Sequence, residues 1–532
     1  MTRPLPPGIS EESLSAAIDA FVEALGADGV LTTTAETDEF RDPFEPKSWS
    51  TYVASVVVLP TSTEEVQAVV RIANEHRIPL WTHGQGRNNG YGGAAPRVRG
   101  AVTMSLRRMN KVLEINEELG YAVVEPGTTW LELYQAIQDG GHRLMLSCTD
   151  LGWGSVIGNS LEHGLTYTPY GQDFSAPCGM EVVLADGELL RTGMGAMTDN
   201  PAWHLYKRGL GPTLDQLFMQ SNFGVVTRMG LWLHPMPEAY VPVWVRVWDE
   251  ADLVPLVDTL RRLRLDRTIE AVPVIYNTLI YASGSSRRAD WFDGDGPIPD
   301  ITIDHIAKEI ESGRWLIRLG LFGDEAVVDH QFAKIKRAFE QIPRAEVWGT
   351  RIPADEAPSL QNPAELVGAG VPNMALSHQT GWYGEEEGGH IGFSPVVPMR
   401  GKDAFEVHTL LRRTIEQDAN LDYMVGSVAI NARSLINVGF IAFDTRDEAQ
   451  ARRAYDTSKH LVAKAAEHGY GEYRAHLDFM DLAAKHYDFN DRAYMRFVER
   501  IKDAVDPNGI LSPGKQGIWP EHLRDGGAVA AD

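Results

Sequence analysis

The stretch best suited to hold a ligand through its backbone is residues 83–96 (HGQGRNNGYGGAAP), with five glycines in the ten positions from Gly84 to Gly93. Glycine is favoured where φ must be positive or where a ligand approaches too closely for a Cβ, and successive N–H groups in such turns form anion sites. The run lacks the Gly-Lys-Ser/Thr ending of a P-loop and opens no apolar-periodic helix, as a Rossmann fingerprint would. A phosphate-cradling loop and a glycine-rich surface turn both fit the spacing.

Four other residues carry ionisable side chains whose role depends on their surroundings. They are Asp150, His390 within residues 388–395 (GGHIGFSP), and the neighbours Tyr473 and Arg474. Taken alone, Asp150 fits a turn, His390 fits a loop, and the Tyr-Arg pair fits a surface position after a helix. The spacing alone assigns none of them a reaction.

Composition limits the class of protein. The chain has 532 residues, with 49 Lys plus Arg against 73 Asp plus Glu and a net charge of −24. Such acidity disfavours nucleic acid and anionic lipid as partners. Cys148 and Cys178 are too few for a disulfide framework or a zinc site, no metal is expected, and no apolar stretch approaches the roughly 20 residues of a membrane span. The N-terminus lacks an apolar signal core. These features predict a soluble, cytoplasmic, enzyme-sized protein.

The elements around the glycine run alternate between strand and helix. Residues 53–59 predict a strand, Ser62 begins a helix with an apolar face, and residues 77–82 predict a short strand entering the glycine run. Two strands flanking Asp186 and Gly187 predict a hairpin. This mixed α/β region is expected to close near residue 235.

A second region, from about residue 241 to about 483, has a different pattern. Residues 243–247 and 315–322 predict strands followed by helices, and residues 423–431 and 435–443 predict paired strands. An antiparallel sheet with helices on one face, an α+β arrangement, fits this pattern.

Several motifs, in this order along nearly the whole chain, resemble the vanillyl-alcohol oxidase family of flavoproteins, and within it bacterial eugenol oxidases and 4-alkylphenol oxidases. They are residues 86–96 (GRNNGYGGAAP), 150–155 (DLGWGS), 167–171 (YTPYG), 191–196 (RTGMGA), 471–474 (GEYR) and 506–515 (DPNGILSPGK). The resemblance implies a two-domain α+β fold. Its FAD-binding domain would comprise residues 1–235 and the returning segment 486–532, and residues 236–485 would form the cap over the substrate.

The resemblance also implies a reaction. A para-alkylphenol becomes a good hydride donor when it ionises, so the site must bind a phenolate; Tyr91, Tyr473 and Arg474 match the phenolate-binding set of the family, with Tyr167 nearby. Hydride transfer from the benzylic carbon to flavin N5 would leave a p-quinone methide. Asp150 matches the carboxylate near N5, which acts as a base toward water or toward the side chain. The products would be a benzylic alcohol, a vinyl or propenyl phenol, or a carbonyl compound.

The cofactor implied is FAD, attached covalently through its 8α-methyl group to His390. Lys515 matches a basic position near the N1/C2=O edge of the flavin, where it and Arg474 would stabilise the anionic reduced ring. The remaining residues expected to bind the cofactor are Gly84, Gly86, Arg87, Asn88, Asn89, Gly90, Gly92, Gly93, Ser155, Gly158, Asn159 and Val225.

The electron acceptor and the assembly follow from the resemblance alone. Residues 150–155 resemble the oxidases more than the cytochrome-linked relative, which favours O2 as acceptor and hydrogen peroxide as product, and a homodimer is the family default. Two alternatives are a dehydrogenase of the same fold that uses a redox partner and a flavin-binding scaffold without turnover. Departures from the family pattern at residues 433–437 and 382–387 put the choice of substrate in doubt more than the type of reaction.

Overall fold

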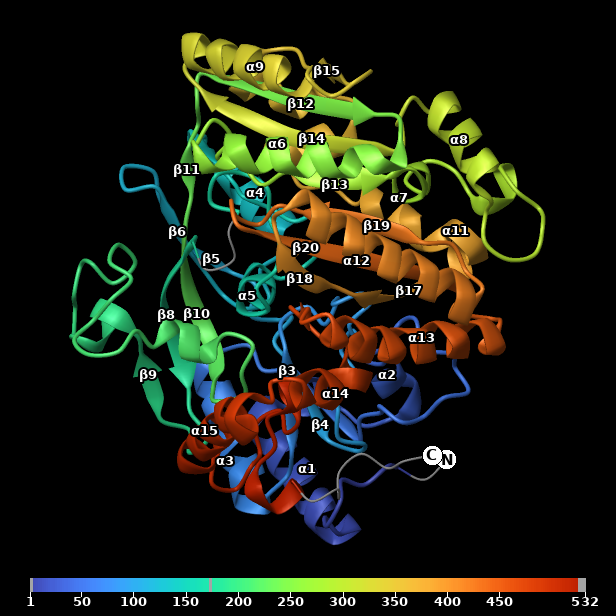
Figure 1. Ribbon diagram of the computed structural model, residues 1–532. Helices are drawn as coiled ribbons and strands as arrows, with labels where there is room; N and C mark the ends of the chain where they lie inside the picture. The colour runs from blue at the N-terminus through green and yellow to red at the C-terminus, as the bar shows by residue number, and fades with distance from the viewer. Residues whose placement is uncertain (1–2, 172–174, 525–532) are drawn as a thin grey trace.

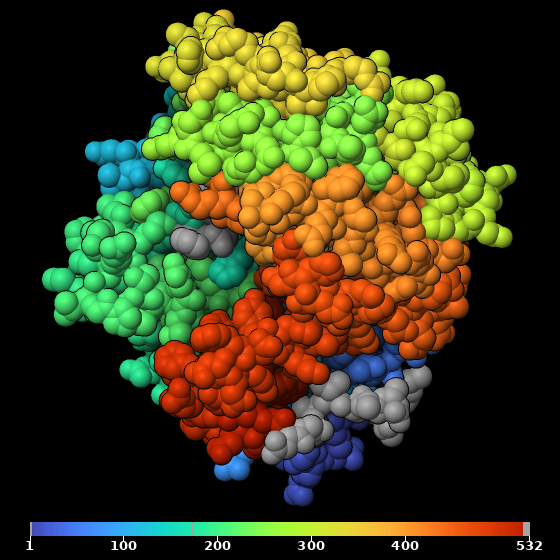
Figure 2. All heavy atoms as spheres, viewed as in Figure 1, coloured from blue at the N-terminus to red at the C-terminus, as the bar shows by residue number. Residues whose placement is uncertain are grey.

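The computed structural model describes residues 3–171 and 175–524. Figure 1 shows three main sheets, with the middle of the chain at one end of the molecule and both ends of the chain at the other. Figure 2 shows the same arrangement: yellow residues lie at the top, red and blue residues lie at the bottom, and orange residues lie between them. No helix among the described residues is both long and apolar enough to cross a bilayer.

The first sheet leads into the glycine run. Its strands, in the order β1-β2-β4-β3, are β1 (Val30–Leu31), β2 (Val56–Val58), β4 (Val102–Ser105) and β3 (Leu80–His83). Both β2 and β3 are parallel to β4. Between β2 and β3 lies α3 (Thr63–His76), which begins at Ser62 as predicted and buries Val66, Val69, Val70 and Ala73. The glycine run therefore starts at the carboxyl end of a parallel strand.

Two further helices and their caps complete this layer. α1 (Glu11–Leu25) begins where the Ser10 hydroxyl accepts a hydrogen bond from Ser13 N (3.1 Å) and ends at Gly26, and α2 (Thr34–Asp38) begins at Thr33. Leu14, Ala17 and Phe21 of α1 are buried in the core that covers the first sheet. The apolar face fixes the position of the helix, as its spacing predicts.

The second sheet is antiparallel and lies beside the first. Its order is β5-β6-β10-β8-β9, with β5 (Val112–Asn116), β6 (Tyr121–Val124), β10 (Val225–Trp232), β8 (Pro177–Val183) and β9 (Leu189–Arg191). β8 and β9 form the hairpin predicted at Asp186 and Gly187. α4 (Trp130–Asp139) and α5 (Val156–Leu161) precede β8, and β7 (Leu144–Met145) pairs with β11 (His234–Pro235).

The third sheet belongs to the middle of the chain, and all its pairs are antiparallel. Its strands are β12 (Ala239–Val247), β13 (Val274–Asn277), β14 (Trp315–Gly323), β15 (Glu346–Trp348), β16 (Ile352–Pro353), β17 (Gly388–Phe393), β18 (Pro395–Pro398), β19 (Met424–Val428), β20 (Ser434–Asp444) and β21 (Gly471–Glu472). The predicted pairing of strands near 423–431 and 435–443 is confirmed by β19 and β20. β14 runs through the middle of this sheet and is buried over most of its length.

The helices of this region connect or cover these strands. They are α6 (Leu253–Leu265), α7 (Thr278–Ala282), α8 (Asp300–Glu309), α9 (Glu325–Phe339), α10 (Pro363–Gly368), α11 (Gly381–Gly384), α12 (Gly401–Thr414) and α13 (Glu448–Glu467). Buried apolar side chains of α6, α9, α12 and α13 join one large core with the inner residues of the sheet.

The C-terminal segment returns to the first sheet, as the resemblance implies. After α14 (Met480–Lys485) and α15 (Phe489–Val505), Leu511 bridges Leu80 in β3. The fully buried ammonium of Lys502 donates to Asp506 Oδ2, Asn222 O and Leu511 O, each at 2.7 Å. This buried charge is paired and fully hydrogen-bonded, which is the condition for retaining it in a core. It holds the returning chain beside the glycine run.

Candidate active site

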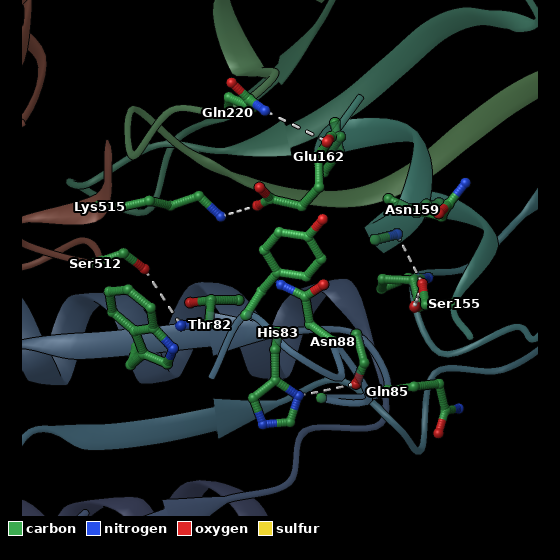
Figure 3. A pocket seen from close by; sticks show the side chains of 18 of the residues that line it. Thr82, His83, Gln85, Asn88, Ser155, Asn159, Glu162, Gln220, Ser512 and Lys515 are labelled. Carbon is green, nitrogen blue, oxygen red and sulfur yellow. Dashed lines mark hydrogen bonds and ion pairs between the residues drawn. The ribbon is translucent and has the colours of Figure 1, made fainter. Parts of the chain in front are cut away.

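A cavity of about 270 Å³ lies where the glycine run, α5, the start of β10 and the C-terminal segment meet. Figure 3 shows Thr82, His83 and Asn88 along one wall, with Lys515 facing Glu162 from another segment. Of the predicted residues, those on its wall are Gly84, Gly86, Arg87, Asn88, Asn89, Tyr91, Gly93, Ser155, Gly158, Asn159, Val225, Arg474 and Lys515. The structure therefore brings together segments that are far apart in the sequence.

The backbone of the glycine run needs glycine. Gly86, Gly90, Gly92 and Gly93 have φ between 59° and 104°, a region that residues with a Cβ rarely occupy. A Cβ on Gly84 would lie 2.5 Å from Pro126 O and 2.6 Å from Ser155 Oγ. Gly90 and Gly92 lie off the cavity wall, where a Cβ would overlap His390 and Leu477. Of the two interpretations left open by the spacing, the ligand-holding loop fits the structure, because the run forms a cavity wall.

The side chains beside this loop suit a large, polar, partly aromatic cofactor. Ser155 Oγ accepts from Gly158 N (2.8 Å) and donates to Pro126 O (2.6 Å), which fixes the turn into α5. The Arg87 guanidinium lies 4.9 Å from the centre of the Trp153 ring. Backbone N–H groups, asparagine amides and cationic side chains on one wall fit the phosphates and the ring edge of FAD.

His390 lies against the glycine run although it comes from β17 of the third sheet. Its ring stacks on Phe440 at 3.9 Å between centroids and contacts Phe44 at 5.0 Å, while Nδ1 is buried without a hydrogen-bond partner among the described residues. Desolvation lowers the pKa of His390 to about 3. A neutral imidazole with a free nitrogen lone pair is the form that acts as a nucleophile.

Lys515 and Glu162 form an ion pair across the cavity (Figure 3). Their side chains are 20% and 16% exposed. The Glu162 carbonyl accepts from Gln220 Nε2 (3.4 Å) and Arg474 Nη1 (3.5 Å). Glu162 therefore links the two cationic residues expected near the flavin, a role that the sequence did not indicate.

Tyr91, Tyr473 and Arg474 form one cluster beside the cavity. The Arg474 guanidinium lies 4.1 Å from the ring centre of Tyr91 and 5.4 Å from that of Tyr473. The Tyr91 hydroxyl is 3.3 Å from Ser394 Oγ, and Tyr473 N donates to Ser394 O at 3.2 Å. Burial raises the pKa of Tyr473 well above its usual range, against the opposing effect of Arg474. Its hydroxyl thus stays protonated and able to donate.

The charge of Arg474 is not neutralised by direct contact. Among residues 3–171 and 175–524, no carboxylate forms an ion pair with it, and its Nε is buried without an acceptor. The Glu162 carboxylate, which acts on it from further away, is itself paired with Lys515. A buried, uncompensated guanidinium flanked by two phenols is suited to bind an anionic oxygen.

Asp150 lies in a second cluster and has two partners. Tyr167 donates its hydroxyl proton to Asp150 Oδ2, and Arg318 Nη1 donates to Oδ1 at 3.3 Å. The Arg318 guanidinium lies 4.3 Å from the ring centre of Tyr167 and 5.8 Å from that of Tyr276. Burial, followed by the charge of Asp150, raises the pKa of Tyr167. Asp150 adjoins the cavity through its neighbours Thr149 and Leu151, which are on the wall.

Arg318 is a second site residue, after Glu162, that sequence reasoning missed. It lies in β14 between the buried Ile317 and Leu319 and is 3% exposed. A charged residue in an otherwise apolar strand is rarely buried without a partner, and this signal was available in the sequence. The partner was not predictable, since Asp150 lies 168 positions away.

The departures from the family pattern fall in the third sheet and beside it. Asn437 is buried in β20, where its Oδ1 accepts from Ser427 Oγ at 2.8 Å, and Trp382 Nε1 donates to Asp422 Oδ2 at 2.8 Å. Trp382 Nε1 thus has an acceptor, whereas Asn437 Nδ2 is buried without one among the described residues.

Two domain models and a known flavoprotein match the sequence of this chain. Residues 54–193 match the FAD binding domain model, and residues 439–516 match the C-terminal domain model of FAD linked oxidases. The chain is 36% identical over 517 residues to the flavoprotein subunit of 4-cresol dehydrogenase (hydroxylating) from Pseudomonas putida, covering 97% of each chain. The match extends along the whole chain and includes both ends of the predicted cap.

Two solved structures are similar throughout. The 4-ethylphenol oxidase from Gulosibacter chungangensis has a TM-score of 0.93 and 39% identity, with 98% of this chain and 100% of that chain covered. A p-cresol methylhydroxylase has a TM-score of 0.91 and 35% identity, with 97% and 99% covered. The predicted two-domain fold, with a mixed α/β part and an antiparallel cap, is confirmed, while the domain boundaries at 235 and 485 stay predictions.

Proposed function

The chain belongs to the vanillyl-alcohol oxidase family of FAD-linked oxidoreductases, and from this premise we propose that it is an FAD-dependent oxidase of para-substituted phenols. The observation that carries the proposal is the guanidinium of Arg474, which has no ion pair with a described carboxylate and lies against the phenol rings of Tyr91 and Tyr473. 4-Alkylphenols, eugenol-like phenols and 4-hydroxybenzyl alcohols such as vanillyl alcohol share the phenol that this cluster fits.

The phenol must be bound as its anion. An ordinary phenol ionises near pH 10, and lowering this to about 7 requires roughly 4 kcal/mol of preferential anion binding. Hydrogen bonds to charged groups contribute about 1.5 to 3 kcal/mol each. Arg474, Tyr91 and Tyr473 supply three donors, so this cluster is sufficient.

Asp150 would act at the other end of the substrate. The phenolate charge supports departure of a hydride from the benzylic carbon, and the substrate becomes a p-quinone methide. When bound, FAD supplies the hydride acceptor and passes the electron pair to O2. Asp150 then takes a proton from attacking water, which gives an alcohol, or from the adjacent carbon, which gives an alkene. A substrate that is already a benzylic alcohol yields a carbonyl compound.

The cavity residues would hold FAD, with the glycine run and Ser155 at its phosphates and Lys515 near the ring edge that becomes negative. His390, neutral and with a free Nδ1, supports covalent attachment through the 8α-methyl group. We expect His390→Ala to release FAD on denaturation, whereas FAD that stays with the denatured variant would remove His390 as the attachment site.

O2 is the proposed acceptor because residues 150–155 resemble the oxidases; one similar solved structure is a 4-ethylphenol oxidase. The second candidate is a dehydrogenase that passes electrons to a partner, which the name of the Pseudomonas relative favours. We further propose that the protein is cytoplasmic and that it forms a homodimer, which is the default assembly of the family.

An anaerobic spectrum separates these candidates. We expect 4-ethylphenol to bleach the flavin absorbance of the purified protein and admitted air to restore it rapidly with formation of hydrogen peroxide. Bleaching without rapid recovery would replace the oxidase by the partner-linked dehydrogenase. No bleaching by any para-alkylphenol would contradict phenol oxidation and favour a scaffold without turnover.

A further inference from the structure

Arg318 has more hydrogen-bonding capacity than its known contacts use. Its Nη1 donates to Asp150 Oδ1 (3.3 Å) and to Ala364 O (3.1 Å). Its Nη2 is buried and reaches no acceptor in the part of the chain that the structure describes. Leaving a buried donor of a charged group unsatisfied is unfavourable, so an acceptor is expected when the ligand is bound.

The position of that acceptor follows from the geometry of the guanidinium. Nη1 and Nη2 belong to one rigid planar group, so an oxygen bound to Nη2 lies close to Asp150. Oδ1 of Asp150 accepts from Arg318 Nη1 and Oδ2 accepts from Tyr167, and Nη2 forms a hydrogen bond with neither oxygen. Each carboxylate oxygen keeps a further lone pair, so Asp150 can still act as a base while Nη2 lacks an acceptor.

In the proposed function, the side chain of the substrate reacts next to Asp150. The inference that follows rests on that proposed function. We propose that Nη2 of Arg318 donates a hydrogen bond to an oxygen on the benzylic carbon of the ligand. Arg318 is then a specificity-determining residue that favours 4-hydroxybenzyl alcohols and their carbonyl products over 4-alkylphenols. Its contact through Nη1 holds Asp150 in place at the same time.

A matched pair of unreactive ligands tests this directly. 4-Hydroxyacetophenone and 4-isopropenylphenol have nearly the same shape, and neither has a hydrogen on its benzylic carbon, but only the ketone offers an oxygen there. Titration of the flavin spectrum of the holoprotein gives both dissociation constants. Measurements over a range of pH correct for the different acidities of the two phenols. We expect the corrected constants to favour the ketone by about 10-fold or more.

The variant Arg318→Lys separates the two contacts. Lysine keeps a positive charge near Asp150 but lacks the planar fork that serves two acceptors. We expect the preference for the ketone to fall about 10-fold while the affinity for 4-isopropenylphenol changes little. The matched control is Arg246→Lys on the neighbouring strand β12, since Arg246 pairs with Glu346 far from Asp150 and should leave the preference unchanged.

The outcomes are distinct. An equal affinity for the two ligands in the wild-type protein, or an unchanged preference in Arg318→Lys, would overturn this inference and leave phenol oxidation standing. If neither ligand perturbs the flavin spectrum, both this inference and the proposed function fall. The wild-type comparison remains decisive if the Arg318 variant does not fold.

Discussion

The two ends of the proposed substrate site each contain a buried arginine, but the two arginines are paired differently. Arg474 lies between two phenol rings and makes no ion pair with a carboxylate in the described residues. Arg318 also lies over two phenol rings, yet it is paired with Asp150 at 3.3 Å. The first cluster carries a positive charge without a directly paired carboxylate and is proposed to bind an anion; the second is an ion pair that presents a carboxylate. In the proposed function, this difference would give a para-substituted phenol its direction in the site.

The most damaging change to this arrangement is expected to be Arg474→Met, which removes the uncompensated charge. Loss of one preorganised donor to a developing or bound oxyanion typically costs 10²- to 10³-fold. We therefore expect kcat/KM for 4-ethylphenol to fall by about 10²- to 10³-fold, measured by stopped-flow reduction of the flavin. Arg474→Lys, which keeps the charge, should recover part of the loss. Rates near the wild-type value in Arg474→Met would remove this residue from the phenolate site.

The variant Asp150→Asn changes the other end of the site, because it removes the carboxylate and leaves an unpaired arginine at each end, Arg318 and Arg474. We expect kcat to fall by about 10²-fold through loss of the base. The unpaired Arg318, 3% exposed, should also lower the free energy of unfolding by about 3 kcal/mol. The double variant Asp150→Asn/Arg318→Met should regain stability in thermal denaturation without regaining rate. An unimpaired rate in Asp150→Asn would exclude the carboxylate as the base.

The fold around these clusters was more predictable than the clusters themselves. The glycine run, the helix after Ser62 and the hairpin at Asp186 depend on neighbouring residues, so local patterns identify them. The contacts of Arg318 with Asp150 and of Lys515 with Glu162 join residues 168 and 353 positions apart. Only the folded chain brings such pairs together, so the resemblance supplied Asp150 and Lys515, while their partners Arg318 and Glu162 needed the structure.

The variant Tyr91→Phe separates the contribution of a neutral hydrogen-bond donor from that of the Arg474 charge, because it removes the donor and leaves the charge. A hydrogen bond to a charged group contributes about 1.5 kcal/mol at the lower end of its range, so we expect about a 10-fold loss of kcat/KM. Steady-state kinetics with 4-ethylphenol would measure it. Because Tyr91 contacts Ser394 Oγ at 3.3 Å, Ser394→Ala serves as a control for loss of that contact alone. A loss as large as that of Arg474→Met would contradict the primary role given to the charge.

The smallest effect concerns Glu472, next to the phenolate cluster. Both its carboxyl oxygens lie 3.0 Å from Ser394 N, and burial raises the pKa of Glu472 to about 8. Below pH 8 the group is neutral and leaves Arg474 uncompensated, whereas above pH 8 it ionises and opposes an anionic ligand. We expect kcat/KM to fall about 3-fold as the pH rises through 8, since solvent and protein screen the added charge. Glu472→Gln should lack this fall, and a fall that persists in the variant would exclude Glu472 as its origin.

The same group affects stability with a definite sign. Its folded pKa of about 8 lies above the unfolded value of about 4.3, so the folded state holds the proton more tightly. This stabilisation is fully present below a pH of about 4.3 and is lost as the pH rises through about 8. Thermal denaturation of the wild type and of Glu472→Gln across this range should show a decline that the variant lacks.

The most direct test of the account is the ionisation state of a bound phenol. The ultraviolet difference spectrum of 4-hydroxyacetophenone bound to the holoprotein, recorded below the pH at which the free ligand ionises, distinguishes phenolate from phenol. The account predicts the phenolate spectrum, and its loss in Arg474→Met. A bound ligand with the spectrum of the neutral phenol would contradict the claim that the Arg474 cluster is an anion receptor.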